Sequence, residues 1–230
     1  MTRFFDGYKA ILFDFDGLLV NTEQLHYQAY KKLVENHNGN LAINFIEFAA
    51  MAHTSSTALK AYLLDTFEEL AAIPWNELYA EKQEIFLSLL TKDNLEFMPG
   101  ADAIIEYLRD EGKALCVVTN SSSQLTDKIR SHLPLLNEIP HWITRECYTN
   151  PKPEPDGYLA SLELLNTTAD EAVGFEDSLR GARSLIAAHV KPVLVCDPTH
   201  PQMKDPLSKT LTKFETFIEL LELLPELNKR

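Results

Sequence analysis

Two aspartates, Asp14 and Asp16, directly follow the apolar run Ala10–Phe13, and Gly17 follows them. Strands are depleted in aspartate, and an ionised carboxylate beside a buried run is costly. Because residues two apart on an extended strand point the same way, both carboxylates can face one point just beyond the strand. The alternative is a strand that ends in an ordinary turn closed by Asp and Gly. The pair therefore indicates chemistry only if other polar groups converge on it.

Two other polar segments follow apolar runs, and a third lies between them in the sequence. Thr119–Ser123 follows one strand-like run, Glu176–Ser178 follows another, and Lys152 stands between prolines in Asn150–Asp156. In an open parallel sheet, ligands bind outside the carboxyl ends of the strands. Each segment alone is typical of a helix cap, a turn or a solvated loop. Together they predict one site that combines carboxylates, hydroxyls and a cation.

Short β-rich runs alternate with helical periodicity, which predicts βα units and a parallel sheet covered by helices on both faces. The expected strands are Lys9–Phe13, Ala114–Val118, Ala172–Phe175 and Val193–Cys196, with a further short one at His141–Thr144. The expected helices around them are Ala101–Glu111, Ser123–Leu133, Asp156–Asn166, Leu179–Ala188 and Phe214–Leu224. The predicted fold class is α/β.

The interval between the first two strands is far too long for a single crossover helix. Apolar residues at threes and fours predict helices at Glu23–Glu35, Phe45–Ala52, Ser56–Thr66 and Trp75–Leu90. Their spacing assigns Trp75, Tyr79 and Phe86 to a core. We expect a helical subdomain over residues 19–95, hinged near Leu18–Asn21 and Asp93–Pro99, inserted into a core formed by residues 1–18 and 96–230.

Taken in order, Asp14-Phe15-Asp16-Gly17, Thr119, Lys152 and Gly174–Ser178 resemble the four motifs of the haloacid dehalogenase superfamily. The resemblance covers essentially the whole chain. Within the superfamily, the chain is similar to the branch of β-phosphoglucomutases and phosphoglycolate phosphatases. It implies a Rossmann-like core in which the inserted helices form a C1-type cap. Asn21 departs from the pattern, because relatives often carry Asp there.

The resemblance implies a nucleophilic role for Asp14, which would accept a phosphoryl group, and an acid–base role for Asp16. Members that break carbon–halogen bonds generally lack an aspartate at the position of Asp16, so phosphoryl transfer is favoured over dehalogenation. Lys152 is expected to contact the phosphoryl group and Asp14. Thr119 and the backbone N–H of Asn120 are expected to donate hydrogen bonds to it.

A phosphate and a carboxylate approach each other only with cations present, and Mg²⁺ suits hard oxygen ligands. The ligands that the resemblance implies are the Asp14 carboxylate, the Asp16 carbonyl, Asp177, and Glu176 either directly or through water.

Substrate contacts are expected from both parts of the chain. Gly17 permits the turn towards the cap, Ser121 follows the second motif, and His26 and His53 are cap candidates. His26 is equally consistent with an ordinary, partly exposed helix residue. The Thr54-Ser55-Ser56 run beside His53 is equally consistent with a helix cap. The mutase carries an arginine for the remote phosphate in a loop that corresponds to Met51–Ser56, where this chain has none. Hydrolysis is therefore favoured over mutase action.

The net charge of −13 repels phosphate backbones, which argues against a nucleic-acid partner. Three scattered cysteines fit neither a disulfide framework nor a zinc site, and we see no signal peptide or membrane span. We expect a cytoplasmic monomer or weak dimer that acts on a small phosphorylated metabolite. The alternatives are a phosphosugar mutase and, from another class, a non-catalytic binding protein of the same fold.

Overall fold

The computed structural model describes residues 4–54 and 56–224, with the side chains of 53, 54 and 56 outside the description. A six-stranded parallel sheet lies at its centre, in the order β3-β2-β1-β4-β5-β6. The strands are β1 Ala10–Phe13, β2 Ala114–Val118, β3 His141–Ile143, β4 Ala172–Glu176, β5 Lys191–Val195 and β6 Thr212–Phe214. The strand order reverses at β1, which places the ligand crevice of such a sheet beyond its carboxyl end. The predicted α/β fold class is confirmed.

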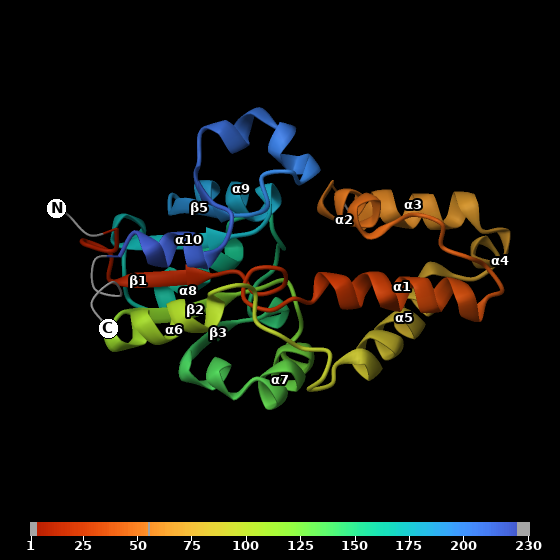
Figure 1. Ribbon diagram of the computed structural model, residues 1–230, viewed down its shortest axis with the longest axis horizontal. Helices are drawn as coiled ribbons and strands as arrows, with labels where there is room; N and C mark the ends of the chain where they lie inside the picture. Colours follow the sequence, from red (N-terminus) through yellow and green to blue (C-terminus); the bar gives the residue numbers. More distant parts are fainter. Residues whose placement is uncertain (1–3, 55, 225–230) are drawn as a thin grey trace.

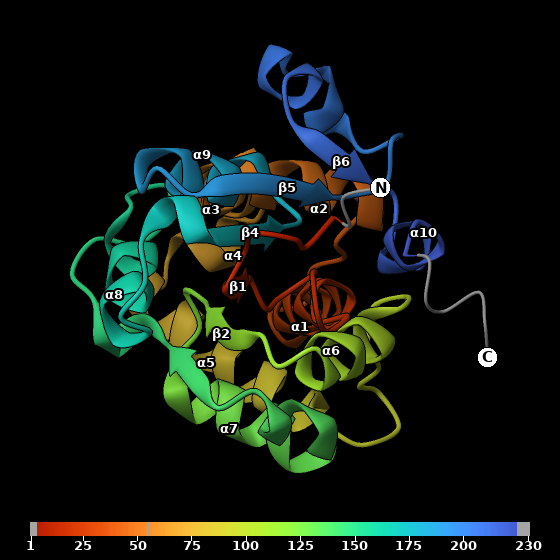
Figure 2. The same cartoon turned by 90° about the vertical axis from the view of Figure 1, so that its left-hand side faces the viewer.

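Helices cover both faces of the sheet, and alternate residues of β1 serve the two layers. Ile11 and Phe13 pack with the first layer and Leu12 with the second, all fully buried. The first layer is α6 Ala101–Asp110, α7 Ser123–His132 and α10 Phe217–Glu222, and the second is α8 Asp156–Leu164 and α9 Leu179–Ala187. Figure 2 shows α8 and α10 on opposite sides of the strands. This alternation is the period of two expected of a buried strand.

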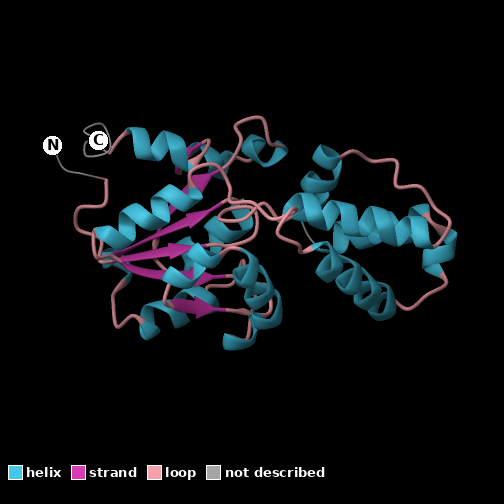
Figure 3. Cartoon of the chain, turned by 60° about the horizontal axis from the view of Figure 1, so that its bottom comes forward, coloured by secondary structure: helices cyan, strands magenta, loops and turns pink. Residues whose placement is uncertain are grey.

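Between β1 and α6 the chain forms a separate helical subdomain, which extends away from the sheet (Figures 1 and 3). Its helices are α1 Glu23–Asn36, α2 Phe45–Thr54, α3 Ser56–Thr66, α4 Glu68–Ala71 and α5 Trp75–Leu89. It has an apolar cluster of its own, in which Leu33, Phe48 and Leu63 are buried. None of the described helices is long and apolar enough to cross a membrane.

The two chain segments that join the subdomain to the sheet run side by side. Val20 forms an isolated bridge with Phe97, and the Asn21 N–H donates to the Glu96 carbonyl at 3.0 Å. The Asn21 side chain also donates to the Glu96 carboxylate at 2.9 Å. Asn21, which departs from the expected Asp, therefore links the two crossing segments.

The structure corrects two element predictions and adds several short elements that were not predicted. The helix expected over Phe214–Leu224 begins only at Phe217, because Thr212–Phe214 pairs with β5 and Thr216 caps the helix. The strand expected at Val193–Cys196 covers Lys191–Val195 instead. The short helix α4 was not predicted, and neither were the 3₁₀ turns η1 Pro134–Glu138, η2 Arg145–Cys147, η3 Ala169–Glu171, η4 Pro201–Lys204 and η5 Pro206–Lys209. Short turns lack the periodicity on which the sequence analysis relies.

Leu12→Ala is expected to lower the free energy of unfolding by about 2–5 kcal/mol, since it leaves a cavity in the second layer of the core. Urea unfolding followed by circular dichroism measures the change. Ile46→Ala is the control, because Ile46 is 65% exposed, and its change should stay within about 0.5 kcal/mol. Equal effects of the two substitutions would contradict the described burial.

Candidate active site

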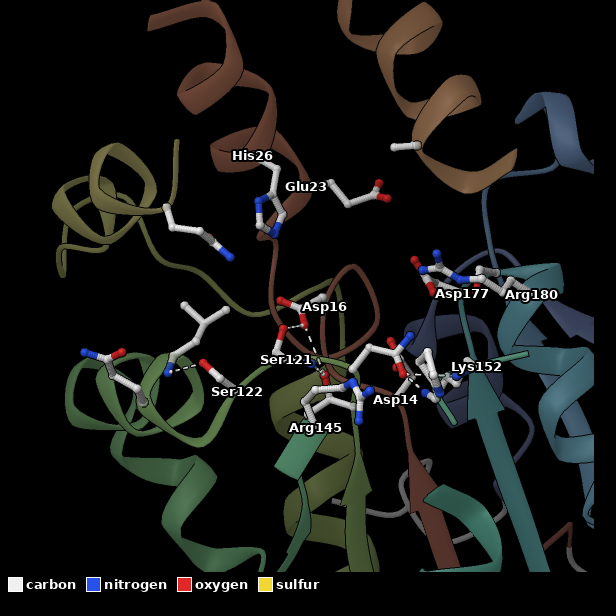
Figure 4. Close-up of a pocket in the computed structure, with 18 of the residues that line it drawn as sticks. Asp14, Asp16, Glu23, His26, Ser121, Ser122, Arg145, Lys152, Asp177 and Arg180 are labelled. Atoms are coloured by element: carbon white, nitrogen blue, oxygen red, sulfur yellow. Dashed lines mark hydrogen bonds and ion pairs between the residues drawn. The ribbon is translucent and has the colours of Figure 1, made fainter. Parts of the chain in front are cut away.

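The polar segments singled out in the sequence meet at the carboxyl edge of the sheet. Asp14 and Asp16 follow β1, Thr119 follows β2, and Asp177 follows β4. A cavity of about 720 Å³ lies between this edge and the helical subdomain, and Figure 4 shows the side chains around it. Of the predicted site residues, those that line the cavity are Asp14, Asp16, His26, Thr119, Asn120, Ser121, Lys152 and Asp177.

Lys152 is buried and uses its ammonium group to join three strands. Its Nζ donates to Asp14 Oδ1 at 2.5 Å, to Glu176 Oε1 at 2.6 Å and to the Val118 carbonyl at 2.7 Å. Tyr158 donates a further hydrogen bond to Glu176. Burial pulls the pKa of Lys152 down, but the charges of Asp14 and Glu176 outweigh it and raise that pKa above its ordinary value. Lys152 therefore stays charged at the base of the cavity.

Asp14 and Asp16 lie in different environments. Burial and the nearby Glu176 charge raise the pKa of Asp14 to about 6, against the opposing effect of Lys152. Burial also raises the pKa of Asp16, whose oxygens accept hydrogen bonds from Ser121 Oγ at 2.6 Å and Thr22 Oγ1 at 2.8 Å. Asp14 thus has a cation beside it and Asp16 has hydroxyl donors. Such a division favours separate nucleophilic and proton-transferring roles.

Three carboxylates form a set that a cation could join. Oxygen atoms of Asp14, Glu176 and Asp177 lie within 4.8 Å of one another. Burial and the Asp14 charge raise the pKa of Asp177 well above its ordinary value, a repulsion that a divalent cation would relieve. A Cβ at Gly17 would lie 2.4 Å from Asp177 Oδ2, so only glycine allows this approach. The all-oxygen donor set fits Mg²⁺.

Glu176 lies below the cavity, where Lys152, Tyr158 and Ser178 all contact its carboxylate. It does not line the cavity, whereas the adjacent Asp177 does. Neighbouring residues at the end of a strand point to opposite sides, which explains the different surroundings of these two acids.

The loop after β2 is ordered by its own side chains. Thr119 Oγ1 donates to Asp16 at 3.2 Å and accepts from the Ser121 N–H at 3.0 Å. Asn120 Oδ1 accepts from Tyr148 Oη at 2.7 Å and from the Lys152 N–H at 3.2 Å. The Asn120 side chain therefore holds the Lys152 loop in place, while Ser121 and Thr119 face Asp16.

The family model for haloacid dehalogenase-like hydrolases matches residues 11–195. The chain belongs to this family. Among its relatives, a phosphorylated carbohydrates phosphatase of Thermotoga maritima is 26% identical over 80% of this chain and 82% of its own. A probable pseudouridine-5'-phosphatase of Drosophila melanogaster is 26% identical over 84% of each chain.

Solved structures share the fold of this haloacid dehalogenase-like hydrolase. CbbY from Rhodobacter sphaeroides, in complex with phosphate, is 24% identical with a TM-score of 0.76 over 94% of this chain and 99% of its own. A β-phosphoglucomutase from Clostridium difficile is 19% identical with a TM-score of 0.71 over 97% and 100%. The predicted resemblance and its branch are confirmed.

On the subdomain side of the hydrolase, His26 lines the cavity and stacks on Phe86 with 3.9 Å between ring centroids. Its Nδ1 contacts Lys82 Nζ at 2.7 Å. Burial and the Lys82 charge lower the pKa of His26 well below its ordinary value, and burial lowers the pKa of Lys82 to about 7. A neutral His26 that accepts from Lys82 satisfies both. His53 belongs to α2, but its side chain lies outside the described residues.

Sequence reasoning missed several residues of this site. Tyr79 was assigned to the core but is 44% exposed and lines the cavity, whereas Phe86 is buried as predicted. Arg145 and Arg180 line it as well. Arginines on a short turn and in a first helical turn carry no pattern that separates them from surface charges. The other missed residues are Thr22 and Lys82, which contact Asp16 and His26, and the cavity residues Glu23, Gln83 and Gln124.

Gly181→Ala is expected to lower the free energy of unfolding by about 1–3 kcal/mol, since its Cβ would lie 1.9 Å from the Glu176 carboxylate. The displaced Glu176 would lose Lys152 and Tyr158. Chemical denaturation measures the change. Ile186→Ala on the same helix, 42% exposed, is the control and should change stability by less than about 0.5 kcal/mol. An unchanged stability of the Gly181 variant would contradict the packing of Glu176.

The raised pKa of Asp14 predicts a pH-dependent stability in EDTA. An Asp14 that ionises near pH 6 when folded, against the ordinary 3.8, contributes stability below pH 3.8 that is lost as the pH rises through 6. Asp14→Asn lacks this loss, so its advantage over wild type should grow by on the order of 2–3 kcal/mol between pH 4 and 7. Urea unfolding at each pH measures it, and parallel curves would contradict the assignment.

Proposed function

We propose that this protein is a Mg²⁺-dependent phosphatase that hydrolyses a small phosphomonoester through an aspartyl-phosphate on Asp14. The observation that carries this is the buried contact of Lys152 with Asp14, with Asp16 facing the same cavity. Lys152 keeps one Asp14 oxygen in place, and the other carboxylate oxygen is the nucleophile. The relatives named as phosphatases support the same reaction class.

The proposed reaction has two steps, transfer of the phosphoryl group to Asp14 and its hydrolysis. An Asp14 oxygen attacks phosphorus as the ester P–O bond breaks, and Asp16 gives its proton to the leaving alkoxide. Asp16, now ionised, takes a proton from water as that water attacks the phosphorus. The bond between phosphorus and the Asp14 oxygen breaks, so inorganic phosphate leaves and the Asp14 carboxylate is regenerated. The raised pKa of Asp16 suits a group that must hold a proton before the first step.

Asp14, Asp177 and the Asp16 carbonyl are the proposed ligands of Mg²⁺, with Glu176 acting through water because Lys152 and Tyr158 contact its carboxylate. When bound, the ion neutralises the charge that Asp14 and the phosphate bring together. Lys152 places a second positive charge against the phosphoryl group. The Asn120 backbone N–H donates a hydrogen bond to its oxygens, and so do the Thr119 and Ser121 hydroxyls, which turn from Asp16 when the substrate binds.

Residues 19–95 are the proposed cap, and its closure over the cavity would exclude bulk water from the first step. Gly17 allows the turn into the cap, and His26 and His53 are the proposed cap contacts to substrate. The cavity of about 720 Å³ lies in the range of small-molecule sites. We further propose a cytoplasmic monomer or weak dimer without a nucleic-acid partner, in keeping with the free cysteines Cys116, Cys147 and Cys196.

Mutase action is the weaker candidate. Residues 19–95 contain no arginine, so the cap has no guanidinium with which to hold the remote phosphate of a sugar bisphosphate intermediate. The arginines that line the cavity belong to the core.

The test is phosphate release from a panel of small phosphomonoesters, with and without Mg²⁺. Wild type should turn over at least one ester only with Mg²⁺, and Asp14→Asn should lower kcat about 10³-fold or more. Asp170→Asn is the matched control, since Asp170 is in η3, at the opposite edge of the sheet, and should keep full activity. Undiminished turnover by Asp14→Asn would contradict the mechanism, and an isomerised sugar phosphate without phosphate release would establish the mutase.

A further inference from the structure

Arg180 and Arg145 line the cavity, and neither forms an ion pair with a carboxylate in the part of the chain that the structure describes. Each other described arginine does so at the surface: Arg109 with Asp110 and Glu138, Arg130 with Asp127, and Arg183 with Asp205. The two cavity arginines therefore differ in kind from those of the outer surface.

Arg180 has the larger unmet hydrogen-bonding capacity. It belongs to the first turn of α9, three residues after Asp177, and its Nε is buried without a hydrogen-bond partner. Its positive charge acts on Asp14, where it partly opposes the rise in pKa that burial causes. A buried guanidinium nitrogen without a partner is costly unless a ligand supplies one.

Arg145 supplies positive charge from the Ser121 side of the cavity, since its N–H donates to the Ser121 carbonyl at 2.9 Å. Its guanidinium is oriented by the carbonyls of Tyr148 and Thr149, at 2.8 and 3.1 Å. Carbonyl contacts fix the position of a guanidinium without neutralising its charge. Figure 4 shows Arg180 beside Asp177 and Arg145 towards Ser121.

These two charges come in addition to the groups that the proposed mechanism assigns to the transferred phosphoryl group. Lys152, the hydroxyls after β2 and the proposed cation already serve that group. In a protein of net charge −13, surplus cations in a cavity point to an anionic ligand. A guanidinium matches the two oxygens of a carboxylate or a phosphate.

We propose that the substrate carries a second anionic group, a carboxylate or a second phosphate, which Arg180 binds while Arg145 adds attraction. This inference rests on the proposed phosphatase function and deepens it. The core, rather than the cap, then selects the substrate class: phosphomonoesters of small acids or small bisphosphates.

The test compares matched ester pairs. Kinetic constants are measured for 3-phosphoglycerate against glycerol 3-phosphate, which tests a carboxylate, and for fructose 1,6-bisphosphate against fructose 1-phosphate, which tests a second phosphate. In at least one pair, wild type should prefer the member that carries the second anionic group. Arg180→Gln should lower kcat/KM for that member, mainly through KM, by at least about tenfold more than for the partner that carries a single phosphate. Arg180→Lys should restore part of the preference, and Arg145→Gln should reduce it less.

Arg183→Gln on the same helix is the control and should keep the wild-type preference, since Arg183 pairs with Asp205 outside the cavity. Calorimetry with Asp14→Asn measures the binding of the same esters without turnover, so it reports on the second anion separately from catalysis. Equal losses on both members of a pair would overturn the inference, and so would a wild type without preference. Either result leaves the phosphatase function standing, whereas absent turnover of every ester would contradict that function itself.

Discussion

The buried contact of Lys152 with Asp14 and Glu176 is the interaction on which the rest of the structure depends. It joins residues 138 positions apart in the sequence, and it places one positive charge between two carboxylates at the carboxyl ends of β1 and β4. A buried charge pair of this kind is destabilising if one partner is lost. The Tyr158 hydrogen bond to Glu176 and the close approach of Gly181 complete the enclosure, so helices α8 and α9 serve the site as well as the core.

Much of this arrangement was predictable from local signals. Each motif follows an apolar strand, and parallel strands bring such ends to one edge, so Asp14, Thr119 and Asp177 could be placed together. The contact of Lys152 with Glu176 rather than with Asp177 could not be predicted, because these two acids are adjacent in one motif. Only the pleat of β4 and the packing of α8 give them different surroundings. Tyr79 was misassigned because apolar spacing on a helix does not distinguish a core face from a face that lines a cavity.

The helical subdomain and the sheet domain contribute different charged groups to the cavity. The subdomain contributes His26 and Lys82, whose pKa values burial lowers, so their charge is weak at neutral pH. The sheet domain contributes Lys152, whose pKa its acidic neighbours raise, together with Arg145 and Arg180. A protein of strongly negative net charge thus concentrates positive charge beside the three carboxylates Asp14, Glu176 and Asp177. The arginines of this cavity accordingly lie on the sheet domain, together with Asp14 and Asp16.

The most direct test of the account is to trap the covalent intermediate. Wild type is mixed with Mg²⁺ and its best ester, quenched in acid within a single turnover, and digested for mass spectrometry. We expect the added mass of one phosphoryl group on Asp14, and its absence from the Asp14→Asn protein. A phosphoryl group on a different residue, or continuous phosphate release while Asp14 stays unmodified, would contradict the proposed mechanism.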